Sequence, residues 1–230
     1  MSILTQDQTK RITDRVLSLS KADECIVNIE GARIGNIRFA RNAVSTAGLA
    51  DDTRLTVQVA FGKRQGTATI NEFDDKSLEK AVRRAEDLAR LAPENPEFMP
   101  AIAKTGYRSS ETYVKATAAI DPEFRAQAAA YAMEACRKKG LVSAGFFTDR
   151  ETFETVANSN GVFGHQVATS LDFTCTVRTE DGRGSGWVKR SARDVAKFDP
   201  REAADVAIEK ALRSVDALSL IHISEPTRRR

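Results

Sequence analysis

The chain has 230 residues, 41% of them hydrophobic and 29% charged, a composition that is typical of a globular protein and excludes a disordered one. Its length fits one large domain or two of ordinary size. The sequence holds no apolar run of the roughly 20 residues that span a bilayer, and charges are scattered through the N-terminus, which excludes a signal peptide.

The first 91 residues predict an α-β-β-β-β-α domain. A helix is expected over 3–20, because Ile12, Val16 and Leu19 fall on one helical face. Alternation and turn signals predict an antiparallel sheet, followed by a helix that Asp74 and Asp75 cap and that Pro93 ends. The strands are expected over 25–29, 34–39, 55–61 and 67–70, with a further candidate over 43–49.

Residues 92–120 contain prolines without sustained periodicity and predict a linker. Residues 121–217 predict a second α+β domain, which opens on a helix with Asp121 as its N-cap and Pro122 in its first turn. Turns at 149–151 and 158–161 separate strand-like runs, and 184–187 is expected to be a loose glycine-rich segment. Asp199 and Glu202 predict a capping box for a last helix. No long-period repeat is evident in the sequence. The expected fold class is therefore α+β: two small antiparallel-sheet units with flanking helices, forming the N-terminal part of a larger multidomain protein.

Residues 218–230 are predicted not to be native. The run Leu218 to Arg228 resembles the translation of a transposase adapter used in shotgun sequencing libraries. The tail carries three arginines and one glutamate, so without it the formal net charge of +3 becomes +1. We therefore expect a parent sequence that continues past Ala217, a near-neutral body that gives no support to nucleic-acid binding, and no functional role for His222.

Few residues are of a type and spacing that carry chemistry. Cys25, Cys136 and Cys175 are odd in number and widely spaced, which predicts three buried, reduced thiols rather than a disulfide framework or a metal site. His165 is the only histidine before the tail. A zinc site needs several converging ligands, so an ordinary strand or loop histidine is favoured over a metal or catalytic role.

Three further features have a structural and a functional interpretation. Gly182, Gly184 and Gly186 fit a loop or bulge that needs small residues better than a phosphate-binding loop, because no helix start follows them. A strip formed by Arg38, Arg41, Lys63 and Arg64 is expected to be a solvated face, because no aromatic residues are interleaved with it. The pairs Asp51-Asp52 and Asp74-Asp75 are expected in turns and caps rather than in a carboxylate dyad.

Several stretches, in this order and spacing, resemble the TldD/PmbA family of zinc peptidases. They are the run Arg38 to Ala47, the strand-turn-strand Phe61 to Thr69, the helix 78–91 that runs into Ala92-Pro93-Glu94-Asn95-Pro96, and the hairpin Val156 to Val162. The likeness covers roughly residues 23–217.

The resemblance implies a cytoplasmic protein that works in a two-subunit assembly. In this family one subunit type carries a His-Glu-x-x-x-His motif and a distal cysteine for zinc, and the other type lacks them. No residue here matches that motif, so the resemblance assigns no catalytic, cofactor-binding or metal-binding residue to this chain. Zinc is expected only in the part beyond Ala217.

Three functions follow as hypotheses. The first is the N-terminal fragment of a metallopeptidase, inactive alone, which shapes the substrate groove and the subunit contact. The second is a non-catalytic partner subunit that acts as a binding and scaffold module, and the third is an α+β interaction domain unrelated to proteolysis. The expected partners are a family subunit, in a homo- or heterodimer, and a peptide substrate. Neither nucleic acid nor a membrane is expected as a partner.

Overall fold

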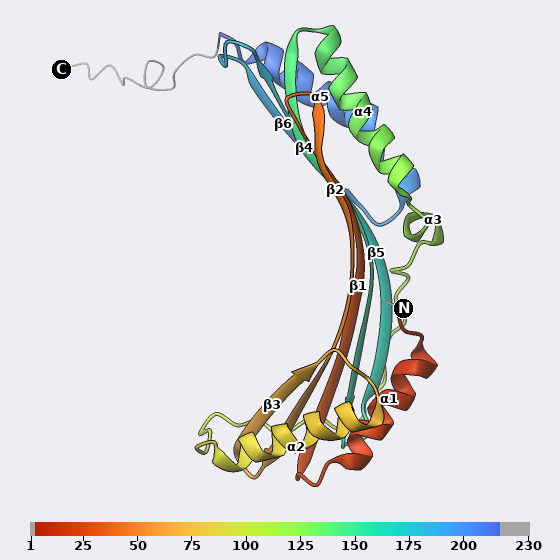
Figure 1. Cartoon of the computed structure of the whole chain (residues 1–230), viewed down its shortest axis with the longest axis vertical. Coiled ribbons are helices and arrows are strands. Elements are labelled where there is room, and N and C mark those ends of the chain that lie inside the picture. The colour runs from red at the N-terminus through yellow and green to blue at the C-terminus, as the bar shows by residue number, and fades with distance from the viewer. Residues whose placement is uncertain (1–2, 217–230) are drawn as a thin grey trace, which may run out of the picture. The chain divides into compact units, whose positions relative to one another are not determined.

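The structure is a computed structural model that describes residues 3–216, so the predicted adapter tail and His222 lie outside the described residues. Figure 1 shows the helices and strands. The helices are α1 (Gln6–Leu19), α2 (Asp75–Leu91), α3 (Lys115–Ala118), α4 (Pro122–Lys138) and α5 (Pro200–Arg213), with a 3₁₀ turn at Val195–Lys197. The strands are β1 (Glu24–Ala40), β2 (Ala43–Phe61), β3 (Arg64–Ile70), β4 (Leu141–Asn158), β5 (Phe163–Thr179) and β6 (Ser185–Ala192).

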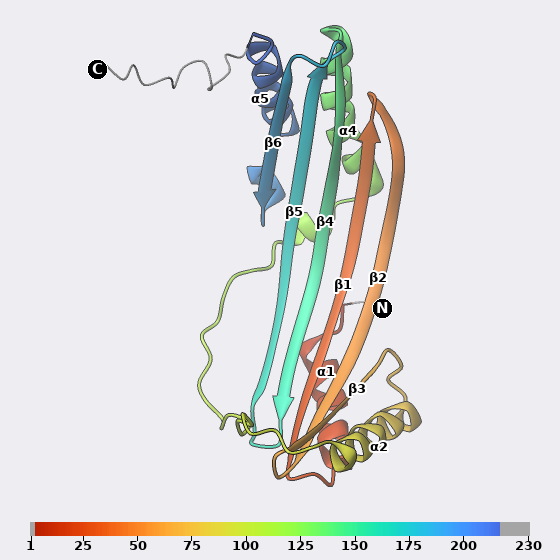
Figure 2. The same ribbon diagram turned by 90° about the vertical axis from the view of Figure 1, so that its left-hand side faces the viewer.

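The predicted α+β class is confirmed, but the strands form one sheet rather than two. Their order is β3-β2-β1-β4-β5-β6 (Figure 2). The pairs β2–β3 and β5–β6 are antiparallel, with Val59 opposite Gly66 and Val177 opposite Gly186. The two predicted sheets are joined because β1 and β4, the first strand of each predicted domain, are hydrogen-bonded neighbours.

Several predicted turns are wrong, because four strands are longer than the sequence pattern indicates. β1, β2, β4 and β5 contain 17 to 19 residues, whereas strands usually contain 3–10. Asp51 and Asp52 lie inside β2 rather than in a turn, and residues 149–151 lie inside β4. The first predicted domain is therefore α-β-β-β-α. Residues 185–187, expected to be loose, begin β6.

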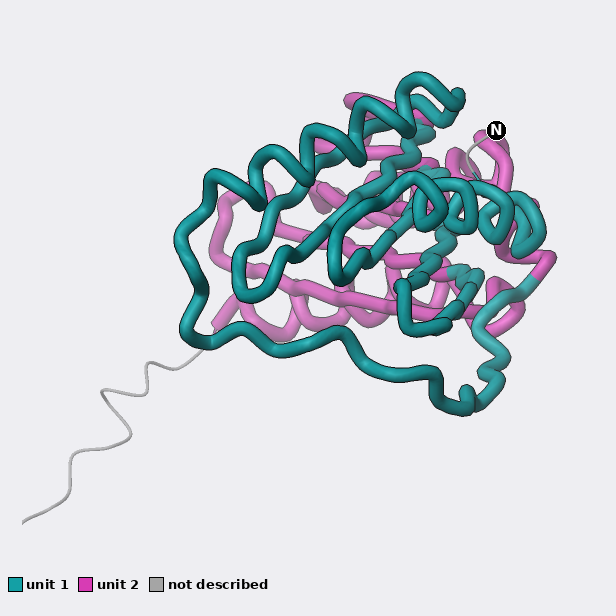
Figure 3. Tube along the Cα trace, turned by 90° about the horizontal axis from the view of Figure 1, so that it is seen from below, with its two compact units in different colours: residues 1–34, 50–114, 150–169 teal, residues 35–49, 115–149, 170–230 magenta. Residues whose placement is uncertain are grey.

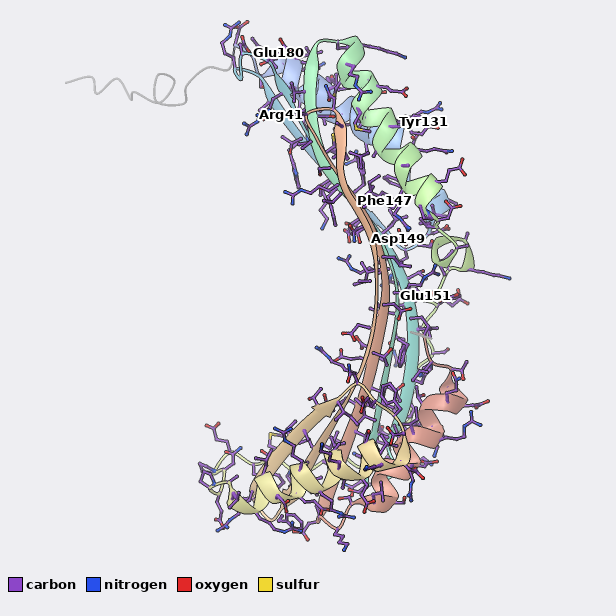
Figure 4. The ribbon with its side chains drawn as sticks, in the orientation of Figure 1. Arg41, Tyr131, Phe147, Asp149, Glu151 and Glu180 are labelled. Carbon is purple, nitrogen blue, oxygen red and sulfur yellow. The ribbon has the colours of Figure 1, made fainter. Side chains whose placement is uncertain are left out.

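Asp149 stays in a strand because a distant arginine neutralises it. Arg125 Nη1 of α4 donates to Asp149 Oδ1 at 2.7 Å, and both side chains are buried. A Cβ on Gly35 would lie 2.1 Å from that guanidinium nitrogen, so only glycine leaves room for the ion pair. Figure 4 labels Asp149 on β4.

Three helices start as predicted, whereas α1 begins at Gln6, with Thr5 as its N-cap, rather than at residue 3. Asp74, Asp121 and Asp199 are N-caps whose side chains accept from backbone N–H groups in the first turns of α2, α4 and α5. The expected capping box at Asp199 is incomplete, since the Glu202 carboxylate accepts from Arg190 Nη2 at 2.7 Å instead.

The chain divides into two compact units, shown in Figure 3, and each has its own core. Unit 1 comprises residues 1–34, 50–114 and 150–169, and unit 2 comprises 35–49, 115–149 and 170–230. The predicted division into 1–91, 92–120 and 121–217 follows chain order, whereas these units are interleaved. In unit 1, α1 and α2 bury Val16, Leu78 and Val82 against the sheet. In unit 2, α4 and α5 cover Phe39, Phe147 and Phe173.

The structure reveals an internal repeat that the sequence does not show. The order α1-β1-β2-β3-α2 recurs as α4-β4-β5-β6-α5, in each case a helix, two long strands, a short strand and a second helix. The far end of each long hairpin belongs to the unit that contains the helices of the other repeat. Each repeat thus contributes strand segments to both cores.

Both hairpin ends are held by the same kind of contact. In unit 2, the Asn42 N–H donates to Ser143 O at 3.2 Å, and Asn42 Oδ1 accepts from the Ser143 N–H at 2.7 Å. In unit 1, the Ser159 N–H donates to Cys25 O at 2.9 Å, and Ser159 Oγ accepts from the Cys25 N–H at 3.2 Å. A turn residue of one repeat therefore clamps the first strand of the other.

The short strands pack against their helices through equivalent glycines. A Cβ on Gly66 would lie 2.1 Å from Ala85 O, and one on Gly186 would lie 2.1 Å from Ala207 O. The prediction that Gly186 sits where a small residue is needed is confirmed, but the neighbour is a helix backbone rather than a bulge.

We expect Gly66→Ala and Gly186→Ala each to lower the free energy of unfolding by about 1–3 kcal/mol or more, because the added methyl group meets backbone that cannot turn aside. Urea denaturation followed by circular dichroism measures this effect. Gly164→Ala is the control, because its Cβ would meet only Val156 Cγ1 at 3.6 Å. Equal midpoints for the three variants would contradict the close packing.

Candidate functional site

A hollow with a volume of about 1240 Å³ lies within unit 1. Its walls come from β1, β4, the first half of β5 and the segment 107–113, which follows α2 in the predicted linker. Drug-sized ligand pockets usually occupy about 300–1,000 Å³, so this groove is large enough for an extended chain.

The segment 107–113 lies along the edge of β5. The Thr169 N–H donates to Thr112 O at 3.0 Å, and Thr112 Oγ1 donates to Val167 O at 2.7 Å. Further along, the Phe163 N–H donates to Tyr107 Oη at 3.1 Å. The segment therefore straps the strand by a few contacts and does not pair with it as a seventh strand.

The groove carries more acidic than basic side chains. Glu30, Glu111 and Glu154 line it together with a single arginine, Arg108. Glu30 is also paired with Arg54, whose Nε lies 2.5 Å from its Oε1. The two remaining carboxylates favour a ligand with positive charge.

Two exposed tyrosines rise from the strap, Tyr107 and Tyr113. Tyr113 Oη donates to Glu151 Oε1 at 3.1 Å. Partial burial, with the charge of Glu151 as a smaller cause, raises the pKa of Tyr113 above its ordinary value, so the phenol remains a donor at neutral pH.

His165 lies in β5 at the same groove, on the side of α1. Its Nδ1 is 2.8 Å from Thr155 Oγ1 and 3.2 Å from Thr9 Oγ1, and its ring packs 6.0 Å from that of Phe153. Burial lowers the pKa of His165, which favours the neutral imidazole. The predicted position of His165 in a strand is confirmed.

The other candidate residues take structural positions. Arg38 and Arg41 belong to unit 2 and Lys63 and Arg64 to unit 1, so no single unit contains the predicted basic strip. Gly182 has a positive φ of 75° in the β5–β6 turn, and a Cβ on Gly184 would lie 2.3 Å from Ala211 O. These two glycines serve a turn and a strand–helix contact.

The described residues do not offer a zinc site. The three cysteines are buried and unpaired, and burial raises the pKa of Cys25 and Cys136 to about 11 and that of Cys175 to about 12, which disfavours the thiolates that bind metals. Within residues 3–216, no three His, Cys, Asp or Glu side chains converge to hold a metal ion. No helix of that range is long and apolar enough to cross a membrane.

The comparisons with known proteins agree on one family. Residues 27–89 match the profile of the PmbA/TldA metallopeptidase domain 1, and residues 71–215 match that of the PmbA/TldA metallopeptidase central domain. A search of curated proteins finds no match.

Solved structures share the fold. TldE from Thermococcus kodakarensis has a TM-score of 0.80 at 15% identity, over 89% of this chain and 47% of its own. A protein described as a proposed modulator of DNA gyrase, from Thermotoga maritima, gives 0.81 at 18%, over 92% and 49%. One so described from Bacteroides thetaiotaomicron gives 0.75 at 18%, over 94% and 52%. The chain thus spans about half the length of these proteins.

We expect unit 1 to lose stability as the pH falls below 6.5, the ordinary pKa of histidine. Because folding lowers the pKa of His165, its contribution is present above pH 6.5 and is lost as the pH falls through the folded value. Urea midpoints between pH 7 and pH 5 should therefore fall more for the wild-type chain than for His165→Asn. Identical pH profiles would show that His165 is not linked to folding.

Proposed function

The chain belongs to the PmbA/TldA metallopeptidase family, and from this premise we propose that it forms the first and central domains of a peptidase, with the groove of unit 1 binding an extended peptide. The β5 edge is the observation that carries the proposal. Its residues 163–169 lie beyond the end of β6, whose register with β5 stops at Leu171. An extended peptide can add to such an edge through main-chain hydrogen bonds.

The strap leaves room for that peptide. Between the Tyr107 contact at Phe163 and the Thr112 contact at Val167, the edge includes the backbone of His165. The groove volume and the exposed tyrosines provide apolar surface for the side chains of a bound chain, and Glu111 and Glu154 favour lysine or arginine among them.

Catalysis by the parent protein would require zinc. Residues 3–216 contain no group of side chains that could hold this ion. We therefore propose that zinc is bound by sequence beyond Ala217, and that the complete protein is cytoplasmic and pairs with a family subunit. The same groove would serve a non-catalytic partner subunit. A His-Glu-x-x-x-His helix in the uninterrupted gene would establish the catalytic type, and its absence the partner type.

Peptide binding is tested with a fluorescein-labelled, unstructured decapeptide that contains two lysines. We expect its fluorescence anisotropy to rise with protein concentration. N-methylation of alternate residues should abolish binding in one of the two alternating patterns and spare it in the other, because only one set of N–H groups faces β5. Equal binding of both methylated peptides would exclude strand addition.

The charge of the groove gives a second prediction. Glu154→Gln should weaken binding of the lysine peptide about two- to fivefold, which corresponds to about 0.4–1 kcal/mol for an exposed charge pair. Glu79→Gln, on the exposed face of α2, is the control. An affinity that falls equally in both variants would reflect overall charge and would contradict a groove site.

We expect the 230-residue chain to show no metal-dependent hydrolysis of the decapeptide, because its described residues supply no zinc ligand set. Mass spectrometry of the peptide after incubation with zinc, and with a chelator, measures this. Hydrolysis that the chelator abolishes and zinc restores would overturn the proposal that zinc is bound by sequence beyond Ala217.

A further inference from the structure

The first seven residues of β2, Ala43 to Leu49, form an unusual edge strand of unit 2. The register of β2 with β3 covers only residues 55–61, so among residues 3–216 the segment has β1 as its only strand neighbour. Every residue from 43 to 52 is exposed, and the side chains of Val44 and Leu49 are 48% and 58% exposed. The seven residues include no charge and no proline, the usual devices that keep an edge from pairing.

The other edges described are covered wholly or in part. At β6, Ser214 Oγ accepts from the Ser185 N–H at 2.8 Å and lies 2.9 Å from Ser185 O, and Lys210 Nζ donates to Trp187 O at 3.0 Å. At β5, the strap bonds Val167 and Thr169, and the stretch around His165 is the edge to which the peptide is proposed to add. The segment 43–49 has no comparable cover among residues 3–216.

The turn before the segment sets which backbone groups face outward. Arg41 and Asn42 have φ of 51° and 57°, the geometry of a two-residue type I′ turn. In such a hairpin the flanking residues, Ala40 and Ala43, direct their N–H and C=O groups at each other. Alternation then directs those of Val44, Thr46 and Gly48 away from β1, where another strand can pair with them.

We propose that this segment pairs antiparallel with the same segment of a second copy of the chain, centred on Thr46. In that register Thr46 faces its own counterpart, Val44 faces Gly48, and Leu49 faces Ala43. Each large side chain meets a small one, and the uncharged Ser45 meets Ala47. An arbitrary peptide would not have this self-complementary order of sizes, so a second copy is the occupant that the sequence favours.

The charges at the ends agree with the same register. Counting outward from Thr46, Arg41 of one copy comes opposite Asp51 of the other, and the two-fold arrangement provides this pair twice. Both side chains are exposed, and Figure 4 labels Arg41 at the end of the β1–β2 hairpin. Arg41 lies in the turn rather than in a strand, so this pair is an attraction between exposed charges at the ends of the paired segments. Because the strand is short, we expect a weak dimer that dissociates on dilution.

Thr46 provides a sharp test, because only a symmetric register places it opposite itself. Thr46→Lys and Thr46→Glu should each raise the dissociation constant of the dimer about two- to fivefold, since like charges then face each other across the strands. An equimolar mixture of the two variants should dimerise again, because lysine then faces glutamate. Sedimentation equilibrium of the 230-residue chain over a range of concentrations measures all of these.

Thr67→Lys, at an exposed threonine of β3, is the matched control and should leave the dimer unchanged. The proposal is overturned if the wild-type chain is monomeric at every concentration, if Thr46→Lys sediments as the wild type does, or if the mixture fails to restore the dimer. Loss of the dimer in Thr67→Lys would instead assign the contact to β3. The decapeptide assay is independent, because its groove lies in unit 1.

Discussion

The fold depends on holding the far ends of two long hairpins. A two-stranded hairpin is marginally stable by itself in water. Asn42 and Ser159, one in each hairpin turn, solve this in the same way: each donates its N–H to the first strand of the other repeat and accepts from that strand through its side chain. Because every long strand supplies both units, neither core can be completed by one repeat alone.

The sequence predicts what is encoded locally and misses what depends on distant residues. Asp74, Asp121 and Asp199 cap their helices as expected, since a cap needs only the next three residues. Residues 149–151 resemble a turn until Arg125 of α4 is seen to neutralise Asp149. The repeat is missed for the same reason, because it too depends on residues far apart in the sequence. Its equivalent glycines, Gly66 and Gly186, can be recognised only from the helices against which they pack.

The groove could not be predicted from the sequence either. Its strap lies in a stretch that predicts only a linker, and the contacts of Thr112 to β5 join residues 55 or more positions apart. The one available signal is the pair Tyr107 and Tyr113, unusual in a flexible connection. The strand position predicted for His165 is confirmed, whereas the absence of a metal or catalytic role stays a prediction that rests on its being the only histidine before the tail.

A duplicated fold gains new features where its repeats cannot be equivalent. Two repeats have a single connection, and here the part of it over 107–113 is the strap that lines the groove beside β5. The sheet edges differ for the same reason. The edge at β6 is capped by Ser214 and Lys210 of its own helix, whereas in unit 2 the opposite edge is the hairpin end of the first repeat, which brings no helix with it. That edge can be covered only by a strand from elsewhere. In residues 43–49 the order of large and small side chains is complementary to the same segment of a second copy.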